Sequence, residues 1–426
     1  MVNSQKYNPW LWIPSLCAAE EIPSAVVMFV ALLMFLQFGA SEAMAALYSG
    51  LLFLPWVMKS YLYSKVRNAG SFKRNLHWVE LLMFVCLMGI AVYISETQVK
   101  DWLLFIFLFL LSCLCAWHEL LSRMYYSRML FPREQQLFRS TKMVFSQIFI
   151  VLTYGILIII AGFFEVFFRS YQKAWAMESS LVAGGFLIFF VLNFVVLRNP
   201  NVTNHYRHES LKDAVKTELH SLARFKEKER VMPCLVSLFF LLLPQALLFN
   251  TRVFFLLAPL ECDGLECSVQ EVGFAQGTIG VVAFSLGVVI GRALMKKGGQ
   301  KDMFWMTAVV LTLSPLSYFL MASDPQPLNL LLICCVTFFA QFCFGFGLNV
   351  CRPFIIYISD QRYRNTTNFL YVPLVASLMV VPMSLSGWLC TMLGYQTYFM
   401  GCVALAPVAW LILTLCRTKA ILFASQ

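Results

Sequence analysis

Long apolar blocks, separated by short polar loops, make up most of this 426-residue chain. A helix needs about 20 apolar residues to cross the hydrocarbon core of a bilayer, and these blocks reach that length. The pattern therefore predicts about twelve membrane-spanning helices. We expect them at residues 9–38, 43–63, 78–94, 102–125, 143–168, 179–197, 231–258, 272–294, 303–321, 328–358, 368–393 and 398–416.

The composition favours the same interpretation, because 60% of the residues are hydrophobic and only 13% are charged. A soluble domain needs far more polar surface than this. The expected fold class is all-α, a polytopic membrane protein of two six-helix bundles. The net charge of +10 does not indicate nucleic acid as a partner, because the basic residues lie in short loops and form no aromatic–basic face.

Residues 198–230 form the longest polar segment of the chain. Its apolar residues recur at helical spacing, at Leu211, Val215, Leu219, Leu222 and Phe225. Such spacing among charged residues predicts an amphipathic helix on the inner membrane surface. We therefore divide the chain into a bundle over 1–197, a cytoplasmic linker over 198–230 and a second bundle over 231–426.

Lysine and arginine gather in alternate loops. With the N-terminus inside, the outer loops hold only Lys100, Arg169 and Lys173, beside acidic residues such as Glu261. The inner loops hold the linker and Lys65, Arg67, Lys73, Arg74, Arg128, Arg133, Arg139, Lys142, Lys296, Lys297, Lys301, Arg362, Arg364, Arg417 and Lys419. Positive residues favour the cytoplasmic side, so we expect both termini in the cytoplasm.

The two halves share several features. At one constant offset, Ser41 aligns with Ser268 and Trp78 with Trp305. The eighth span carries glycines at Gly273, Gly277, Gly280, Gly287 and Gly291. Glycines at this spacing let helices approach closely, as an interface that rocks or slides requires.

Six plus six spans, a charged central segment and a basic loop after the second span resemble the major facilitator superfamily. Within it, Glu20-Glu21-Ile22-Pro23 and the segment from Leu54 to Lys59 resemble AmpG-type muropeptide permeases and the related acetyl-CoA transporters. The resemblance implies a bacterial inner-membrane permease that is driven by protons and moves a sugar-containing solute. Ser64 and Arg67 depart from the group, which usually has a proline and then an acidic residue there.

Charges inside a span are costly, so each is a candidate for function. Glu20 and Glu21 lie about midway along the first span and point about 100° apart on a helix. We favour Glu21 as a proton-titrating or substrate-binding carboxylate, with Glu20 second. A structural ion pair or a wet helix end is the alternative. Pro23 removes a backbone hydrogen bond, and a bend there can expose polar backbone groups at the cavity; a role limited to the shape of the helix is the alternative.

Polar residues of the seventh and tenth spans are candidates for the substrate pathway. Gln245, Gln341 and Asn349 carry amides that can bind a sugar hydroxyl. Asn250 and Arg252 lie near the outer end of the seventh span. Arg252 can meet an anionic substrate or Glu271.

A second group of charges falls toward the inner ends of the spans. Lys59 and Arg352 can pair with Glu119 across the inner mouth, and Arg292 ends the glycine-rich eighth span. We assign Lys59, Glu119, Arg352 and Arg292 to an inner gate. For the two paired cations, contact with lipid phosphates is the alternative.

No metal site or cofactor is expected, because the fourteen cysteines lie mostly in apolar blocks without ligand spacing. Cys262 and Cys267 share one acidic loop, where a disulfide can form if the loop faces an oxidising space. The motif for a nucleotide-binding phosphate loop is absent from the sequence, so ATP is not expected as the direct energy source.

The leading hypothesis is a secondary transporter with a small-molecule solute, protons and membrane lipids as its partners, and not an enzyme. A multi-pass lipid or glycan transferase using His118-Glu119 is the second hypothesis. A membrane sensor that binds without translocating is the third. The sequence leaves the solute, the direction of transport, the coupling ion and the oligomeric state open.

Overall fold

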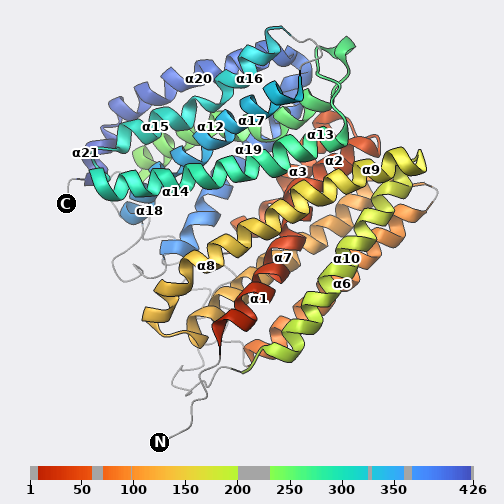
Figure 1. Ribbon diagram of the computed structural model, residues 1–426. Coiled ribbons are helices and arrows are strands. Elements are labelled where there is room, and N and C mark those ends of the chain that lie inside the picture. Colours follow the sequence, from red (N-terminus) through yellow and green to blue (C-terminus); the bar gives the residue numbers. More distant parts are fainter. Residues whose placement is uncertain are drawn as a thin grey trace, which may run out of the picture.

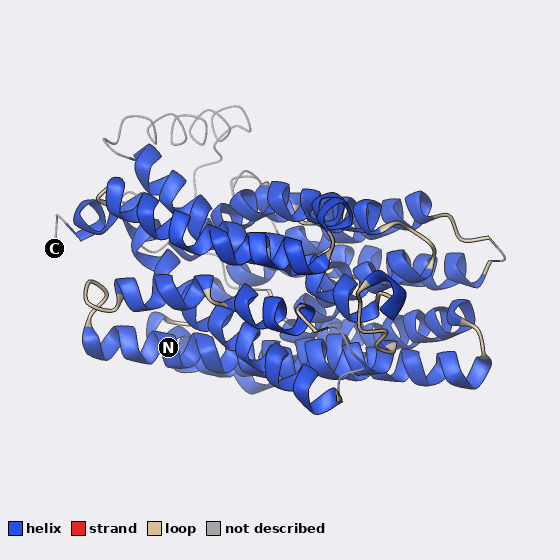
Figure 2. Cartoon of the chain, turned by 90° about the horizontal axis from the view of Figure 1, so that it is seen from above, coloured by secondary structure: helices blue, strands red, loops and turns tan. Residues whose placement is uncertain are grey.

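The computed structural model describes residues 8–59, 71–96, 98–199, 231–324, 329–358 and 367–423. Within these ranges the chain is a bundle of long helices (Figures 1 and 2). In Figure 1 the helices α6, α8 and α10 run obliquely to α12, α14 and α20. The linker expected over 198–230 lies outside the described residues, apart from its first two positions.

The first half contains α1 (Pro9–Ala25), η1 (Val26–Val30), α2 (Ala31–Gln37), α3 (Glu42–Leu52), α4 (Leu54–Val57), α6 (Phe72–Ser95), α7 (Asp101–Met129), α8 (Pro132–Ile150), η2 (Val151–Leu157), α9 (Ile158–Phe168) and α10 (Tyr171–Val196). Each π-helical turn, η1 and η2, continues the helix before it, so α1 to α2 and α8 to α9 each form one span. The π-helical turn η1 begins three residues after Pro23, which itself lies within α1.

The second half contains α12 (Val231–Leu257), η3 (Leu260–Cys262), α13 (Val269–Val272), η4 (Gly273–Gly280), α14 (Val281–Gly298), α15 (Phe304–Thr312), α16 (Ser314–Ala322), α17 (Leu330–Gly347), η5 (Leu348–Val350), α18 (Cys351–Ile358), α19 (Thr367–Leu393), α20 (Tyr395–Leu415) and α21 (Thr418–Phe423). Here the π-helical turn η4 joins α13 to α14.

The membrane-spanning pattern agrees with the sequence. In the described part of the chain, eleven helices are long and apolar enough to cross a bilayer, and Glu42–Val57 is a shorter apolar helix between the first and second of them. Together they give the twelve expected spans in two sets of six. Ser41 and Ser268, which align in sequence, are both N-caps of the second span of their half.

The assignment of basic residues to loops is wrong in several places. Helices, not loops, hold Lys73 and Arg74 (α6), Arg128 (α7), Lys173 (α10), Lys296 and Lys297 (α14) and Lys419 (α21). The fifth span begins at Pro132 rather than near residue 143, so Arg133, Arg139 and Lys142 lie on α8 and not in a loop. Proline at the first turn starts the helix, and the Glu134 side chain accepts the Phe131 N–H at 3.0 Å. Hydropathy misses this extension because its residues are charged.

The bundle has a basic end and an acidic end. We call the end that holds Arg128, Lys296 and Arg417 the basic end, and the end that holds Glu42 and Glu165 the acidic end. The first residues of α1 and the last of α20 lie at the basic end.

The two halves meet most closely toward the acidic end, and glycine makes this possible. A Cβ on Gly277 would lie 2.1 Å from the Tyr154 carbonyl oxygen, and one on Gly387 would lie 2.2 Å from that of Glu42. The close approach expected of the eighth-span glycines is confirmed. Gly277 faces the first half, whereas Gly287 and Gly291 face α17 and η5 of their own half.

Away from this contact the halves separate. Ser285 of α14 donates to Gln147 of α8 at 2.6 Å, and from there α8 and α14 diverge toward the basic end in Figure 1.

At the acidic end a cavity of about 520 Å³ lies between the halves. Its lining includes Glu42, which accepts from Tyr395, and Glu165, which accepts from Gln37 at 3.1 Å. The described helices are thus arranged as a bundle whose halves join at one end.

Candidate functional site

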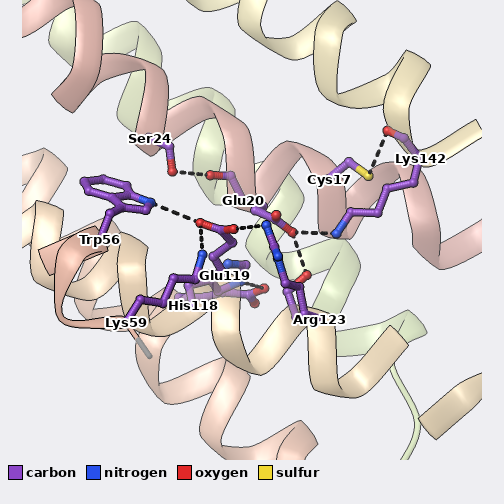
Figure 3. Close-up of polar contacts among 11 residues, drawn as sticks. Cys17, Glu20, Ser24, Trp56, Lys59, His118, Glu119, Arg123 and Lys142 are labelled. Atoms are coloured by element: carbon purple, nitrogen blue, oxygen red, sulfur yellow. Dashed lines mark hydrogen bonds and ion pairs between the residues drawn. The ribbon is translucent and has the colours of Figure 1, made fainter. Parts of the chain in front are cut away.

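The first polar centre is a cluster of five charged side chains in the first half. The charge cluster consists of Glu20 on α1, Lys59 just after α4, Glu119 and Arg123 on α7, and Lys142 on α8 (Figure 3). Four spans supply it. Glu119 lies ten residues before the end of α7 at Met129, which places it roughly 15 Å from the basic end.

Glu119 is the most heavily bonded member of the charge cluster. Its carboxylate pairs with Lys59 and with Arg123, the latter at 2.5 Å. The indole N–H of Trp56 donates to the same carboxylate at 3.0 Å. Because Lys59 is only 2% exposed, its charge depends on this carboxylate for compensation.

Glu20 is the second carboxylate of the charge cluster and pairs with Lys142. Lys142 donates to Glu20 Oε2 at 3.1 Å, and the Ser122 hydroxyl donates to the same oxygen at 2.7 Å. The backbone carbonyl of Glu20 accepts from Ser24 at 2.7 Å, one helical turn on. Glu20 is therefore engaged on both its side chain and its backbone.

Glu21 is left outside this set of bonds. It is half-buried, with Ser146 of α8 and Lys142 among the polar groups around it, and makes no ion pair among the described residues. The cluster itself holds three cations and two carboxylates. Ionised Glu21 balances its charge, and protonated Glu21 leaves one positive charge in excess.

His118 and Glu119 do not act together. His118 points between helices of the first half, where its Nε2 lies 3.2 Å from Glu80 on α6. Asn193 on α10 donates to the same Glu80 oxygen at 2.8 Å. Glu119 points instead to Lys59 and Trp56. Adjacent residues on a helix face different directions, so this pair forms no shared site.

The second polar centre lies where the two halves meet. Arg252 on α12 is buried at 6% exposure, and its guanidinium lies 5.0 Å from the ring centre of Phe249. With its amide oxygen turned toward Arg252, Gln341 on α17 accepts hydrogen bonds from both terminal guanidinium nitrogens. The expected partner Glu271 is occupied elsewhere, accepting the Ser268 N–H at 2.8 Å as a helix cap.

Aromatic rings from the first half complete this second centre. Phe29, on η1, stacks on Tyr154, on η2, with ring centres 4.5 Å apart. It also stacks on Phe249 of the second half at 6.1 Å, and Phe53 meets Phe249 edge-on at 5.6 Å. We call Arg252, Gln341, Phe249, Phe29 and Tyr154 the central site. Two of its residues lie on π-helical turns, which frequently mark functional positions.

The remaining candidates are distributed more widely. Gln245 donates to the Leu311 carbonyl at 2.6 Å inside the second half. Asn250 accepts from Ser49 of α3 at 3.1 Å and so bridges the halves. Asn349 donates to the Phe346 carbonyl at 3.0 Å, beside α14. Arg352 and Arg292 are exposed at the basic end, on α18 and α14, rather than beside Glu119.

Four charged residues of the first half were not nominated from the sequence as site residues. Arg123 and Lys142 join the charge cluster only because the fold brings their spans beside Glu119 and Glu20. Glu80 is fully buried, and Glu178 on α10 is 1% exposed with no hydrogen-bond partner for either oxygen among the described residues. An acidic residue inside an apolar block is the signal that could have found Glu80.

No protein-family model matches the chain, and no curated protein does. Solved structures of transporters do match it. A bacterial homologue of the human lysosomal transporter Spinster, inward-facing and unoccupied, is 13% identical at a TM-score of 0.70, covering 99% of this chain and 97% of that one. The nucleoside transporter NupG is 12% identical at 0.70, covering 97% and 99%.

The D-xylose-proton symporter is 16% identical at a TM-score of 0.61, covering 95% of each chain. At these identities the likeness concerns the fold. The chain therefore shares the overall fold of these transporters, and the comparisons do not reach the narrower AmpG-type group.

Proposed function

We propose that this chain is a secondary transporter that moves a small solute across a bacterial inner membrane by alternating access, coupled to protons. The observation that carries the proposal is the central site. It lies between the halves and combines one buried cation, one amide and stacked rings from both of them. A set of side chains of this composition suits a small polar solute, and a site between two related halves suits a rocking mechanism.

The basic end is the cytoplasmic side in this proposal. Its lysines and arginines follow the positive-inside pattern. The halves approach closely toward the acidic end, and α8 and α14 diverge toward the basic end in Figure 1, which supports a state that faces the cytoplasm. The division into bundles 1–197 and 231–426, with the linker 198–230 between them, is part of the same proposal.

Glu21 is the proposed proton carrier. Glu20 is fixed by Lys142 and Ser122, whereas Glu21 has no ion pair among the described residues and changes the net charge of the cluster by one. A proton on Glu21 therefore alters the electrostatic balance at the junction of four spans. Lys59 and Glu119 are the proposed inner gate beside it. Arg352 and Arg292, exposed at the basic end and not beside Glu119, remain proposed gate residues of the second half.

The solute is proposed to contain a sugar. Ring faces such as those of Phe29 and Phe249 can pack against a pyranose, and the amide of Gln341 can bond one of its hydroxyls. The resemblance of residues 20–23 and 54–59 to AmpG-type permeases supports a muropeptide-like member of this class.

The His118-Glu119 pair of the enzyme alternative does not form, because the two side chains face different partners. A sensor would bind solute without moving it. Reconstituted protein separates these cases, because only a transporter accumulates a labelled solute inside vesicles, and only a transferase forms product from a lipid-linked donor.

The test is uptake of a panel of labelled sugars into proteoliposomes under an inward proton gradient. We expect gradient-driven uptake by the wild type and by the exposed control Glu96→Gln. Glu21→Gln should lose net uptake yet keep solute exchange, since a neutral amide mimics the protonated carboxyl. Uptake that is indifferent to pH and to Glu21→Gln would refute proton coupling.

A further inference from the structure

Arg252 is a buried cation without a carboxylate. Among the described residues, the other buried cationic or imidazole side chains have one: Lys59 pairs with Glu119, and His118 with Glu80. Arg252 has only the Gln341 amide and the Phe249 ring, and its Nε has no hydrogen-bond partner. A guanidinium keeps its charge in proteins, so it cannot escape burial by losing a proton.

An arrangement of this kind is costly in the empty protein. A buried charge that lacks its counterion destabilises a fold, and a neutral side chain of similar size would be cheaper. Gln341 satisfies part of the guanidinium but supplies no negative charge. The missing charge is therefore one that a ligand can bring.

The surroundings limit what that ligand can be. Arg252 lies within electrostatic range of Tyr154 of the first half, whose ring stacks on Phe29. Phe29, Phe53 and Phe249 are only half-buried, so part of each ring remains uncovered where the halves meet. A ligand beside Arg252 can therefore contact apolar aromatic rings as well as the positively charged guanidinium.

We infer that Arg252 binds the oxyanion of the transported solute, which is a sugar acid or a sugar phosphate whose ring packs against Phe29 and Phe249. The guanidinium presents parallel N–H groups that match the two oxygens of a carboxylate or phosphate. This inference rests on the proposed transport function and specifies the substrate class of the same site.

The first experiment measures ligand binding to the purified full-length protein by thermal shift. The probes are glucuronate and glucose 6-phosphate, with neutral glucose as the matched control. Charged hydrogen bonds of this type contribute enough that Arg252→Gln should weaken binding of at least one anion about 10- to 100-fold. Arg252→Lys should bind with intermediate affinity, because it keeps the charge and loses the fork.

Two further measurements guard against a folding artefact. Arg133→Gln, which removes an exposed arginine of α8, should bind the anions like the wild type. Without ligand, Arg252→Gln should melt at the same temperature as the wild type or higher, because it removes an unpaired buried charge. An arginine with a purely structural ion pair would behave in the opposite way.

The inference is overturned if no anion stabilises the wild type, or if Arg252→Gln responds to the anions as the wild type does. Uptake assays keep this result distinct from the proposed function. Binding that depends on Arg252 without any uptake would refute transport and leave the anion site standing. Uptake of neutral glucose alone, unchanged in Arg252→Gln, would refute the anion site and leave the transport function standing.

Discussion

Removing the carboxylate of Glu119 should destabilise the protein strongly. Lys59 is 2% exposed and pairs with this carboxylate, and Arg123 bonds it from one helical turn away. Breaking a buried pair by deleting one partner costs about 3–5 kcal/mol, since the other charge stays buried. We therefore expect Glu119→Gln to lower the free energy of unfolding by about this amount.

A double-mutant cycle with Lys59→Met tests the reason for the loss. In the double variant the buried ammonium is gone, and the remaining Arg123, at 26% exposure, can turn toward water. The double variant should therefore be more stable than Glu119→Gln alone. Residues in direct contact typically show coupling energies of about 0.5–3 kcal/mol.

The assay is dodecyl sulfate titration of the purified protein in mixed micelles, followed by the circular dichroism of its helices. Glu96→Gln, at an exposed position of the acidic end, is the control and should change little. The reasoning fails if Glu119→Gln costs less than about 1 kcal/mol, or if the effects of Glu119→Gln and Lys59→Met simply add.

Three further outcomes are expected. Gly277→Val should force η4 away from the Tyr154 carbonyl, so it should favour the state that is open at the acidic end, measured as faster labelling of a probe at Gln270; unchanged labelling would contradict this. Glu178→Gln should leave stability unchanged or raise it by about 1 kcal/mol, because both carboxyl oxygens lack partners among the described residues; a clear loss in the same titration would count against it. Cys262 should react with a membrane-impermeant maleimide applied from the acidic side without prior reduction, because it is an exposed free thiol; reaction only after reduction would indicate a disulfide.

The sequence predicts the spans well and the pairing of residues poorly. Apolar length alone locates twelve helices, because crossing a bilayer imposes a minimum length on each of them. It fails where a helix continues beyond the apolar core, as α8 does through Arg133 and Lys142. Charged residues there remain helical because the first turn is capped, which hydropathy does not measure.

The candidate site shows the same division. A charge within a span stands out in the sequence, so Glu20, Lys59 and Glu119 could be nominated, and the expected Lys59–Glu119 pair is present. The central site could not be assembled in this way. Phe29, Tyr154 and Phe249 are ordinary aromatic residues in aromatic-rich spans, and only the packing of distant helices brings them beside Arg252.

The roles of the two halves also needed the structure. Glycines in the eighth span predict close packing without naming the partner helix. Gly277 proves to face the opposite half and Gly287 its own, because positions ten residues apart on a helix point about 80° apart.

Alternating access is tested most directly by measuring both ends of the bundle in one preparation. Spin labels carried by an unnatural amino acid, which avoids the fourteen native cysteines, would be placed at Arg133 and Lys297 on the basic end. A second pair would be placed at Val166 and Gln270 on the acidic end. Double electron–electron resonance distances would be recorded at low and high pH, and in Glu21→Gln. The account predicts that one distance lengthens while the other shortens, and that Glu21→Gln abolishes the response to pH. Two distances that change together, or that ignore both pH and Glu21, would contradict it.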